Sequence, residues 1–187
     1  MVLWGREVKV KLVFLPAAAL TVLAGPAYST VYLTIEGAQA RLFPGATFQP
    51  EFRTLTAEQV KEIEKRSGVP VRNKDLKAWR ASTGGWLIAD QVVGKHDFIP
   101  FALALDEGGS VKGVEILEYR EAYGGQIRQS DWRQQFVHRP ANEKLQLGKQ
   151  IRNISGATLS CRHMTDGVTR LLATYSVALR NDAGSKA

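Results

Sequence analysis

The spacing of apolar and polar positions predicts a short amphipathic helix over residues 55–65. Residues 56–59, Thr-Ala-Glu-Gln, are typical of a helix start, with a hydroxyl cap followed by acidic and amide side chains. Val60 and Ile63 then fall on one face of this helix. The glycine and proline within residues 67–70 end it.

Two hairpins are predicted in the middle of the chain. Residues 83–85, Thr-Gly-Gly, interrupt two segments rich in tryptophan and branched side chains (Trp79, Trp86, Leu87, Ile88, Val92 and Val93). Further along, residues 98–105 and 111–119 flank the turn sequence of residues 106–110, Asp-Glu-Gly-Gly-Ser. The short separation of these two segments and their β-branched content predict an antiparallel pair.

The spacing of apolar residues predicts two further helices toward the C-terminus. Trp132 and Phe136 lie four residues apart and predict a short helix over residues 131–138, which Pro140 ends. Residues 163–179 predict the closing helix, because their apolar side chains recur at helical intervals (Val168, Leu171, Leu172, Tyr175 and Leu179). Together the elements predict a single α+β domain over residues 30–182, in which helices pack on a twisted antiparallel sheet. Residues 183–187 are expected to be a disordered tail.

The N-terminal residues 1–27 have the organisation of a secretory signal peptide. Three cationic side chains (Arg6, Lys9 and Lys11) precede an apolar run over residues 12–25, and Gly25-Pro26-Ala27 supplies small residues for cleavage. The run is shorter than the roughly 20 apolar residues of a membrane span, and Pro16 interrupts it. An uncleaved membrane anchor is the alternative interpretation. Either version places the domain outside the cytoplasm.

Composition narrows the classes of partner and cofactor. The net charge of +7 could attract an anionic membrane or an acidic redox partner, although a solvated basic surface explains it best. Lys and Arg are scattered among Asp and Glu without interleaved aromatics, so no nucleic acid is expected. Cys161 is the only cysteine, which excludes an intramolecular disulfide, and we expect it to be a small buried residue. The three histidines (His96, His138 and His163) have no metal-site spacing, so no metal ligand is predicted.

Candidate chemistry lies at the start of the closing helical stretch. Residues 155–160, Ser-Gly-Ala-Thr-Leu-Ser, place hydroxyl groups and little side-chain bulk beside a helix N-terminus. The free N–H groups and the dipole at such an end favour an anion, so a phosphate could bind there. The alternative is an ordinary helix cap, with Ser155 or Thr158 as the N-cap residue and no ligand.

Residues 153–160 (Asn-Ile-Ser-Gly-Ala-Thr-Leu-Ser), followed by residues 165–168 (Thr-Asp-Gly-Val), resemble the FMN-binding domain family. Its members include periplasmic flavin subunits of the Rnf complex and of the sodium-pumping NADH:quinone oxidoreductase. In that family a separate flavin transferase, which uses FAD, esterifies the last Thr of Ser-Gly-Ala-Thr to the phosphate of FMN. The resemblance therefore implies covalent FMN on Thr158 and a flavin transferase as the partner in maturation. It extends more weakly to residues 123–125, which look like a glycine loop that borders the flavin.

One position departs from the family pattern. Arg152 stands three residues before Ser155, where the family usually has Asp. Tight non-covalent FMN, with Arg152 reaching the phosphate, therefore stays open as an alternative. Lys95 and Glu121 are further candidates for contact with the cofactor. An exposed position at a strand end explains Glu121 equally well, and a surface turn without a ligand explains Lys95 slightly better. The complete predicted cofactor-binding set is Thr158, Ser155, Gly156, Ala157, Leu159, Ser160, Tyr123, Gly124, Gly125, Glu121, Arg152 and Lys95.

The resemblance and the leader together imply an exported flavoprotein of the periplasm or the outer membrane face. It would relay electrons through FMN, with a membrane or periplasmic redox protein as electron donor or acceptor. No catalytic residue is predicted. Two alternatives stay open: a flavin-dependent reductase with its own soluble substrate, and a flavin-free binding or assembly module of the same fold. The sequence lacks a Gly-x-Gly-x-x-Gly nucleotide fingerprint, which counts against the reductase.

Overall fold

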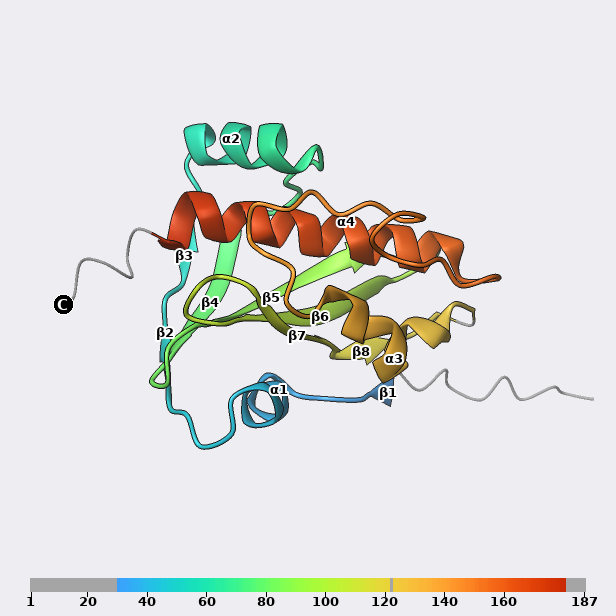
Figure 1. Cartoon of the computed structure of the whole chain (residues 1–187), viewed down its shortest axis with the longest axis horizontal. Helices are drawn as coiled ribbons and strands as arrows, with labels where there is room; N and C mark the ends of the chain where they lie inside the picture. The colour runs from blue at the N-terminus through green and yellow to red at the C-terminus, as the bar shows by residue number, and fades with distance from the viewer. Residues whose placement is uncertain (1–29, 122, 181–187) are drawn as a thin grey trace, which may run out of the picture.

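The computed structural model describes residues 30–121 and 123–180. A central antiparallel sheet organises the molecule (Figure 1). Its strands follow the order β2 (Phe48–Pro50), β4 (Asp75–Ala81), β5 (Trp86–Val93), β6 (Phe98–Leu105) and β7 (Val111–Ile116), and β3 (Arg53–Thr54) also pairs with β4. A two-stranded ladder joins β1 (Thr30–Val31) to β8 (Glu118–Tyr119). The α+β prediction is confirmed, whereas the predicted leader 1–27 and tail 183–187 lie outside the described residues.

Both predicted hairpins are confirmed, because β4 pairs antiparallel with β5 and β6 pairs antiparallel with β7. The turn between β4 and β5 needs glycine, since a Cβ on Gly85 would lie 2.3 Å from the carbonyl oxygen of Leu105. The prediction of one strand over residues 111–119 is wrong at Leu117. There the N–H still donates to Pro100 of β6, but the carbonyl accepts from Tyr32 and the chain turns to pair with β1.

Helices cover the sheet on both faces (Figure 1). Helix α4 (Thr158–Thr174) lies on one face with α2 (Ala57–Ser67) packed beside it, and α1 (Ile35–Leu42) lies on the other. Strand β6 contributes to both cores with period two. Its larger residues belong to the cluster beneath α4 (Ile99, Phe101, Leu103 and Leu105), and its alanines belong to the cluster beneath α1 (Ala102 and Ala104). The strand is therefore almost continuously buried, as expected of a central strand covered on both sides.

The helix predictions differ in how well they locate the helix ends. In α2 the predicted capping box is confirmed between Thr56 and Gln59, and Gly68 ends the helix with φ +73°. Helix α4 begins at Thr158, within the motif of residues 155–160 that was predicted to lie at the helix N-terminus. The apolar pattern starts only at residue 163, because the first turn of the helix is largely polar. The helix continues into a π-helical turn, η3 (Tyr175–Leu179). Among the described residues, none of the helices combines the length and apolar character needed to cross a membrane.

The prediction of one helix over residues 131–138 is wrong. The chain forms α3 (Ser130–Arg133) and then a 3₁₀ turn, η2 (Gln134–Phe136). His138 has φ +66°, a left-handed conformation that an α-helix cannot continue through. Trp132 and Phe136 are nevertheless both buried, with their rings edge to face at 5.2 Å, so the predicted shared face is real.

Candidate functional site

A cleft of about 570 Å³ is lined by residues that follow β8 and by the turn before α4. Figure 1 shows these segments at one end of the molecule. The cleft lining comes from two segments that are far apart in the sequence. Residues 123–126, Arg128 and Gln129 form one wall, which includes the 3₁₀ helix η1 (Gly125–Arg128), and Gly156 contributes from the turn before α4. The structure thus brings together four residues of the predicted set: Tyr123, Gly124, Gly125 and Gly156.

The turn before α4 leaves the Thr158 hydroxyl accessible. Thr158 is exposed, and its Oγ1 accepts a hydrogen bond of 2.9 Å from Nδ2 of Asn153. The N-cap residue is Ala157, with no side-chain cap, so the ordinary-cap prediction for Ser155 or Thr158 is wrong. The reason is that the backbone turns tightly before α4, with the N–H of Ala157 donating to the carbonyl of Ile154.

The start of α4 also offers unused N–H donors to an anion. The bond from the N–H of Cys161 to the carbonyl of Ala157 is the i→i−4 bond of the first helical turn. The N–H groups of residues 158–160 precede it and have no intrahelical acceptor, by the geometry of any α-helix start. Gly156 has φ +80°, and apart from its chain neighbours no described residue has an atom within 4 Å of the position its Cβ would take. The backbone is therefore open to a ligand on the side of Gly156.

A buried tyrosine fastens the glycine loop to α4. The Tyr119 hydroxyl donates to the carbonyl of Tyr123 and lies 3.3 Å from Oγ of Ser160. Burial raises the pKa of Tyr119, so its hydroxyl stays protonated and able to donate. A Cβ on Gly124, which has φ +84°, would lie 2.6 Å from that Ser160 Oγ and 2.7 Å from the Tyr119 hydroxyl. Ser160 is 6% exposed, so its hydroxyl lies on the interior side of the loop.

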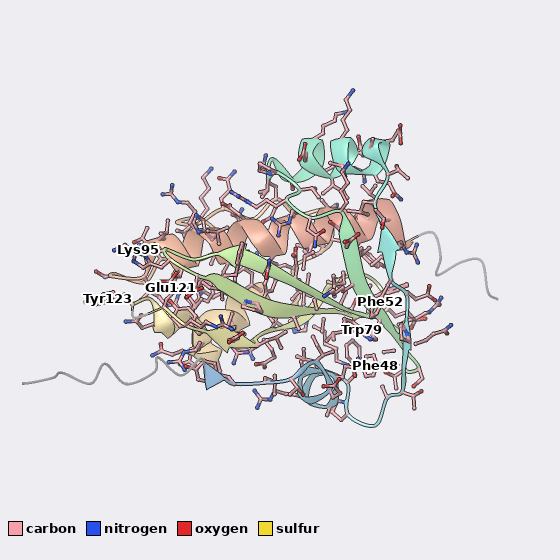
Figure 2. The ribbon with its side chains drawn as sticks, turned by 180° about the vertical axis from the view of Figure 1, so that it is seen from behind. Phe48, Phe52, Trp79, Lys95, Glu121 and Tyr123 are labelled. Atoms are coloured by element: carbon pink, nitrogen blue, oxygen red, sulfur yellow. The ribbon has the colours of Figure 1, made fainter. Side chains whose placement is uncertain are left out.

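Glu121 and Lys95 lie at the same end of the molecule as Tyr123 (Figure 2), although neither lines the cleft. One carboxylate oxygen of Glu121 accepts the N–H of His96 at 2.6 Å and that of Asp97 at 3.0 Å. Partial burial raises the pKa of Glu121, but the N–H groups of His96, Asp97 and Lys95 outweigh it, and the pKa lies below its ordinary value. Glu121 therefore holds the turn that carries the exposed Lys95 side chain.

The remaining predicted residues lie around the helix start. Arg152 is exposed and donates from its backbone N–H and its Nε to Oε1 of Gln135, at 2.7 and 3.3 Å. It does not line the cleft. Ser155 and Leu159 are exposed, whereas Ala157 is buried. The arginine at the departure from the family pattern is thus hydrogen-bonded to Gln135 of η2 and is not among the residues that line the cleft.

Sequence reasoning missed the principal cation of the cleft, Arg128. Its Nε donates to the carbonyl of Gly125 at 3.1 Å, and its guanidinium lies 4.5 Å from the ring centre of Tyr32. Within residues 30–121 and 123–180, no carboxylate forms an ion pair with it. A cation three residues after a glycine pair was the available signal. Tyr119 was missed as well, because its role depends on contacts with distant segments.

Other candidate groups stay away from the cleft. Cys161 is fully buried, as predicted, and burial raises the pKa of its thiol. Trp86 is buried in the core, and Trp79 lies with Phe48 and Phe52 well away from Tyr123 (Figure 2). In the described part of the chain, no group of three His, Cys, Asp or Glu side chains could hold a metal ion.

The segment that forms the cleft matches a known protein family. Residues 94–173 match the model of a family described as FMN-binding domain. The match runs from the turn after β5 through the glycine loop and nearly to the end of α4, so it includes every residue that lines the cleft. A comparison with curated proteins found no match.

Proposed function

We propose, on the premise that this chain contains a domain of the FMN-binding domain family, that it is an exported flavoprotein relaying electrons through FMN joined to Thr158 by a phosphoester. The family makes the chain a flavin-binding protein. The observation that carries the proposed linkage is the exposed Thr158 hydroxyl at the first position of α4, in the same turn as the cleft residue Gly156.

The residues around the cleft fit FMN, which has an anionic phosphate and a broad, flat ring. The open backbone at Gly156 and the free N–H groups at the start of α4 suit the phosphate. The glycine pair, Gly124 and Gly125, lets main chain approach a flat ring closely, and Arg128 adds a cation. A volume of about 570 Å³ lies within the range of ligand pockets, about 300–1,000 Å³.

The chain's own groups would position the cofactor. Asn153 donates to Oγ1 of Thr158 and so fixes the direction of the oxygen that would carry the phosphate. Tyr119 ties the glycine loop to α4, which keeps the two walls of the cleft at a constant separation. FMN supplies the redox chemistry when bound, since its ring accepts and releases one or two electrons.

Export and partners complete the proposal. The leader of residues 1–27 would direct the domain out of the cytoplasm, and a flavin transferase would load it there. Tyr123 is 78% exposed at the rim of the cleft, so a docked redox protein of the membrane or the periplasm can approach to electron-transfer distance. The domain itself would then act as a carrier between two partners.

The experiment is expression with a flavin transferase, followed by denaturing gel electrophoresis under ultraviolet light. The wild-type band should fluoresce and the Thr158→Ala band should be dark, because the phosphoester needs this hydroxyl. Ser155→Ala is the matched control, since it removes the other exposed hydroxyl of the motif and should leave the band bright. A dark wild-type band refutes the covalent linkage.

The non-covalent alternative is tested on the native protein. Dialysed wild-type protein with a flavin spectrum but a dark denatured band would establish tight FMN without a bond to Thr158. Protein that lacks both signals, and lacks added FMN mass after isolation from its native host, would establish the flavin-free module. Rapid reduction by NADH with no partner present would establish the stand-alone reductase instead.

A further inference from the structure

We infer that Arg128 is the residue by which the cleft favours reduced over oxidised flavin. The inference rests on the proposed function, because it takes the phosphate to be at Thr158. The opposite wall of the cleft, residues 123–129, is then left for the ring. Arg128 is the cation of that wall.

Arg128 is held in one orientation by contacts from three parts of the chain. Its Nε donates to the carbonyl of Gly125, its guanidinium lies over the Tyr32 ring at 4.5 Å, and the Tyr119 ring centre is 5.8 Å away. Stacking of this kind stabilises a guanidinium even at exposed sites. The arginine is thereby fixed beside the cleft before any ligand arrives.

The shape of the loop makes room for the guanidinium. A Cβ on Gly125 would lie 3.2 Å from Nη2 of Arg128 and 3.5 Å from its Nε. With hydrogen at that position, the planar guanidinium can lie flat against the loop. Of its five N–H groups, the one on Nε is used within the protein by Gly125. No carboxylate of the described residues neutralises the positive charge, which leaves it available to a ligand in the cleft.

The charge of the ring depends on its redox state. Two electrons from the donor and one proton from solvent convert the neutral oxidised ring into a reduced ring with one negative charge. A guanidinium stays protonated in proteins, so Arg128 attracts the reduced ring more strongly than the oxidised ring. Arg128 is itself exposed, and solvent weakens the attraction. We therefore expect a modest preference, of about tenfold.

The first measurement is the midpoint potential of flavin-loaded protein, titrated against a reference dye. Arg128→Gln should bind reduced flavin about tenfold less favourably relative to oxidised flavin, which lowers the potential by about 30 mV for a two-electron couple. Arg128→Lys keeps the charge without the planar stacking and should fall between. Arg66→Gln is the control for net charge, since Arg66 lies on α2 in an exposed pair with Glu62.

The second measurement separates the ring from the phosphate. Protein made without the transferase is titrated with FMN and with riboflavin, which lacks the phosphate, and flavin fluorescence gives the dissociation constants. A ring contact predicts that Arg128→Gln changes both affinities by the same factor. If the variant weakens FMN and leaves riboflavin unchanged, Arg128 binds the phosphate and the inference is overturned.

Failure of this inference can be told apart from failure of the proposed function. Wild-type protein that takes up no flavin refutes the proposed function and with it the role of Arg128. A loaded Arg128→Gln protein with the wild-type potential refutes the role of Arg128 alone. Should Arg128→Gln fail to fold, Tyr32→Leu retains the arginine and removes its stacking partner, and an unchanged potential in that variant overturns the inference.

Discussion

Gly124→Ala tests whether the glycine loop and α4 are fastened together as described. Gly124 has φ +84°, a conformation that costs a residue with a Cβ roughly 1–2 kcal/mol. The new methyl carbon would also lie 2.6 Å from Oγ of Ser160 and 2.7 Å from the hydroxyl of Tyr119. Both distances are shorter than an ordinary van der Waals contact, so at least one of these side chains must move.

The expected cost follows from these two effects. Moving Tyr119 or Ser160 gives up a hydrogen bond worth about 1 kcal/mol, and local overpacking adds about 1 kcal/mol. Together with the strain at positive φ, Gly124→Ala should lower the free energy of unfolding by about 3 kcal/mol. For a domain of this length, each 1 kcal/mol corresponds to about 2–4 °C in Tm, so we expect a decrease of about 8 °C.

The assay is thermal unfolding of the flavin-free protein, followed by circular dichroism, so that ligand binding adds no stability. Gly45→Ala is the matched control, because Gly45 has φ +77° and, beyond its chain neighbours, the described part of the chain has no atom within 4 Å of where its Cβ would be. It should show the strain alone, about 1 kcal/mol, or about 3 °C. Equal decreases in Tm for the two variants would refute the fastening of the loop by Tyr119 and Ser160.

Two further predictions concern charged groups. Arg133→Met should cost about 3 kcal/mol in urea unfolding, because it leaves the buried Glu115 carboxylate without the partner that lies 2.7 Å away. Arg41→Met removes a more exposed partner, 3.3 Å from the same oxygen, and should lower the free energy of unfolding by only about 0.5 kcal/mol. Similar losses of stability in the two variants would contradict the greater importance of the buried partner. The lowered pKa of Glu121 means that its carboxylate stabilises the fold above the unfolded-state pKa, and that this contribution is lost as pH falls through the folded-state pKa. Wild-type Tm should therefore fall more steeply in acid than that of Glu121→Gln, and parallel Tm curves would count against the hydrogen bonds described.

The sequence was sufficient for elements whose signals are local. The capping box of α2 and the glycine turn between β4 and β5 each specify their structure within a few residues, and both predictions are confirmed. Helix α1 and the short strands β1 to β3 gave no such signal. The strands are two or three residues long and exist because a partner strand is available, which only the folded chain provides.

The same distinction applies to the cleft. Gly124 and Gly156 could be recognised from their neighbours in the sequence, and the structure brings both to the cleft. For Arg128 the neighbouring residues show only a cation after a glycine pair, because its orientation depends on Tyr32, which lies almost a hundred residues earlier in the chain. Lys95 and Arg152 had the right charge for a phosphate, but hydrogen bonding around Glu121 and Gln135 holds their segments outside the cleft lining. Tertiary contacts decide which of several cations faces a ligand.

Strand β6, whose side chains are shared between two cores, has a consequence for protein engineering. Because helices cover both faces of the sheet, a substitution along β6 disturbs one of the two cores. New chemistry therefore has to be introduced at the ends of the strands. The cleft meets that condition, because its walls are built from segments that join or follow strands and from the turn before a helix. Loops grafted at residues 123–129 could therefore alter which ring is accommodated while the scaffold beneath stays as it is.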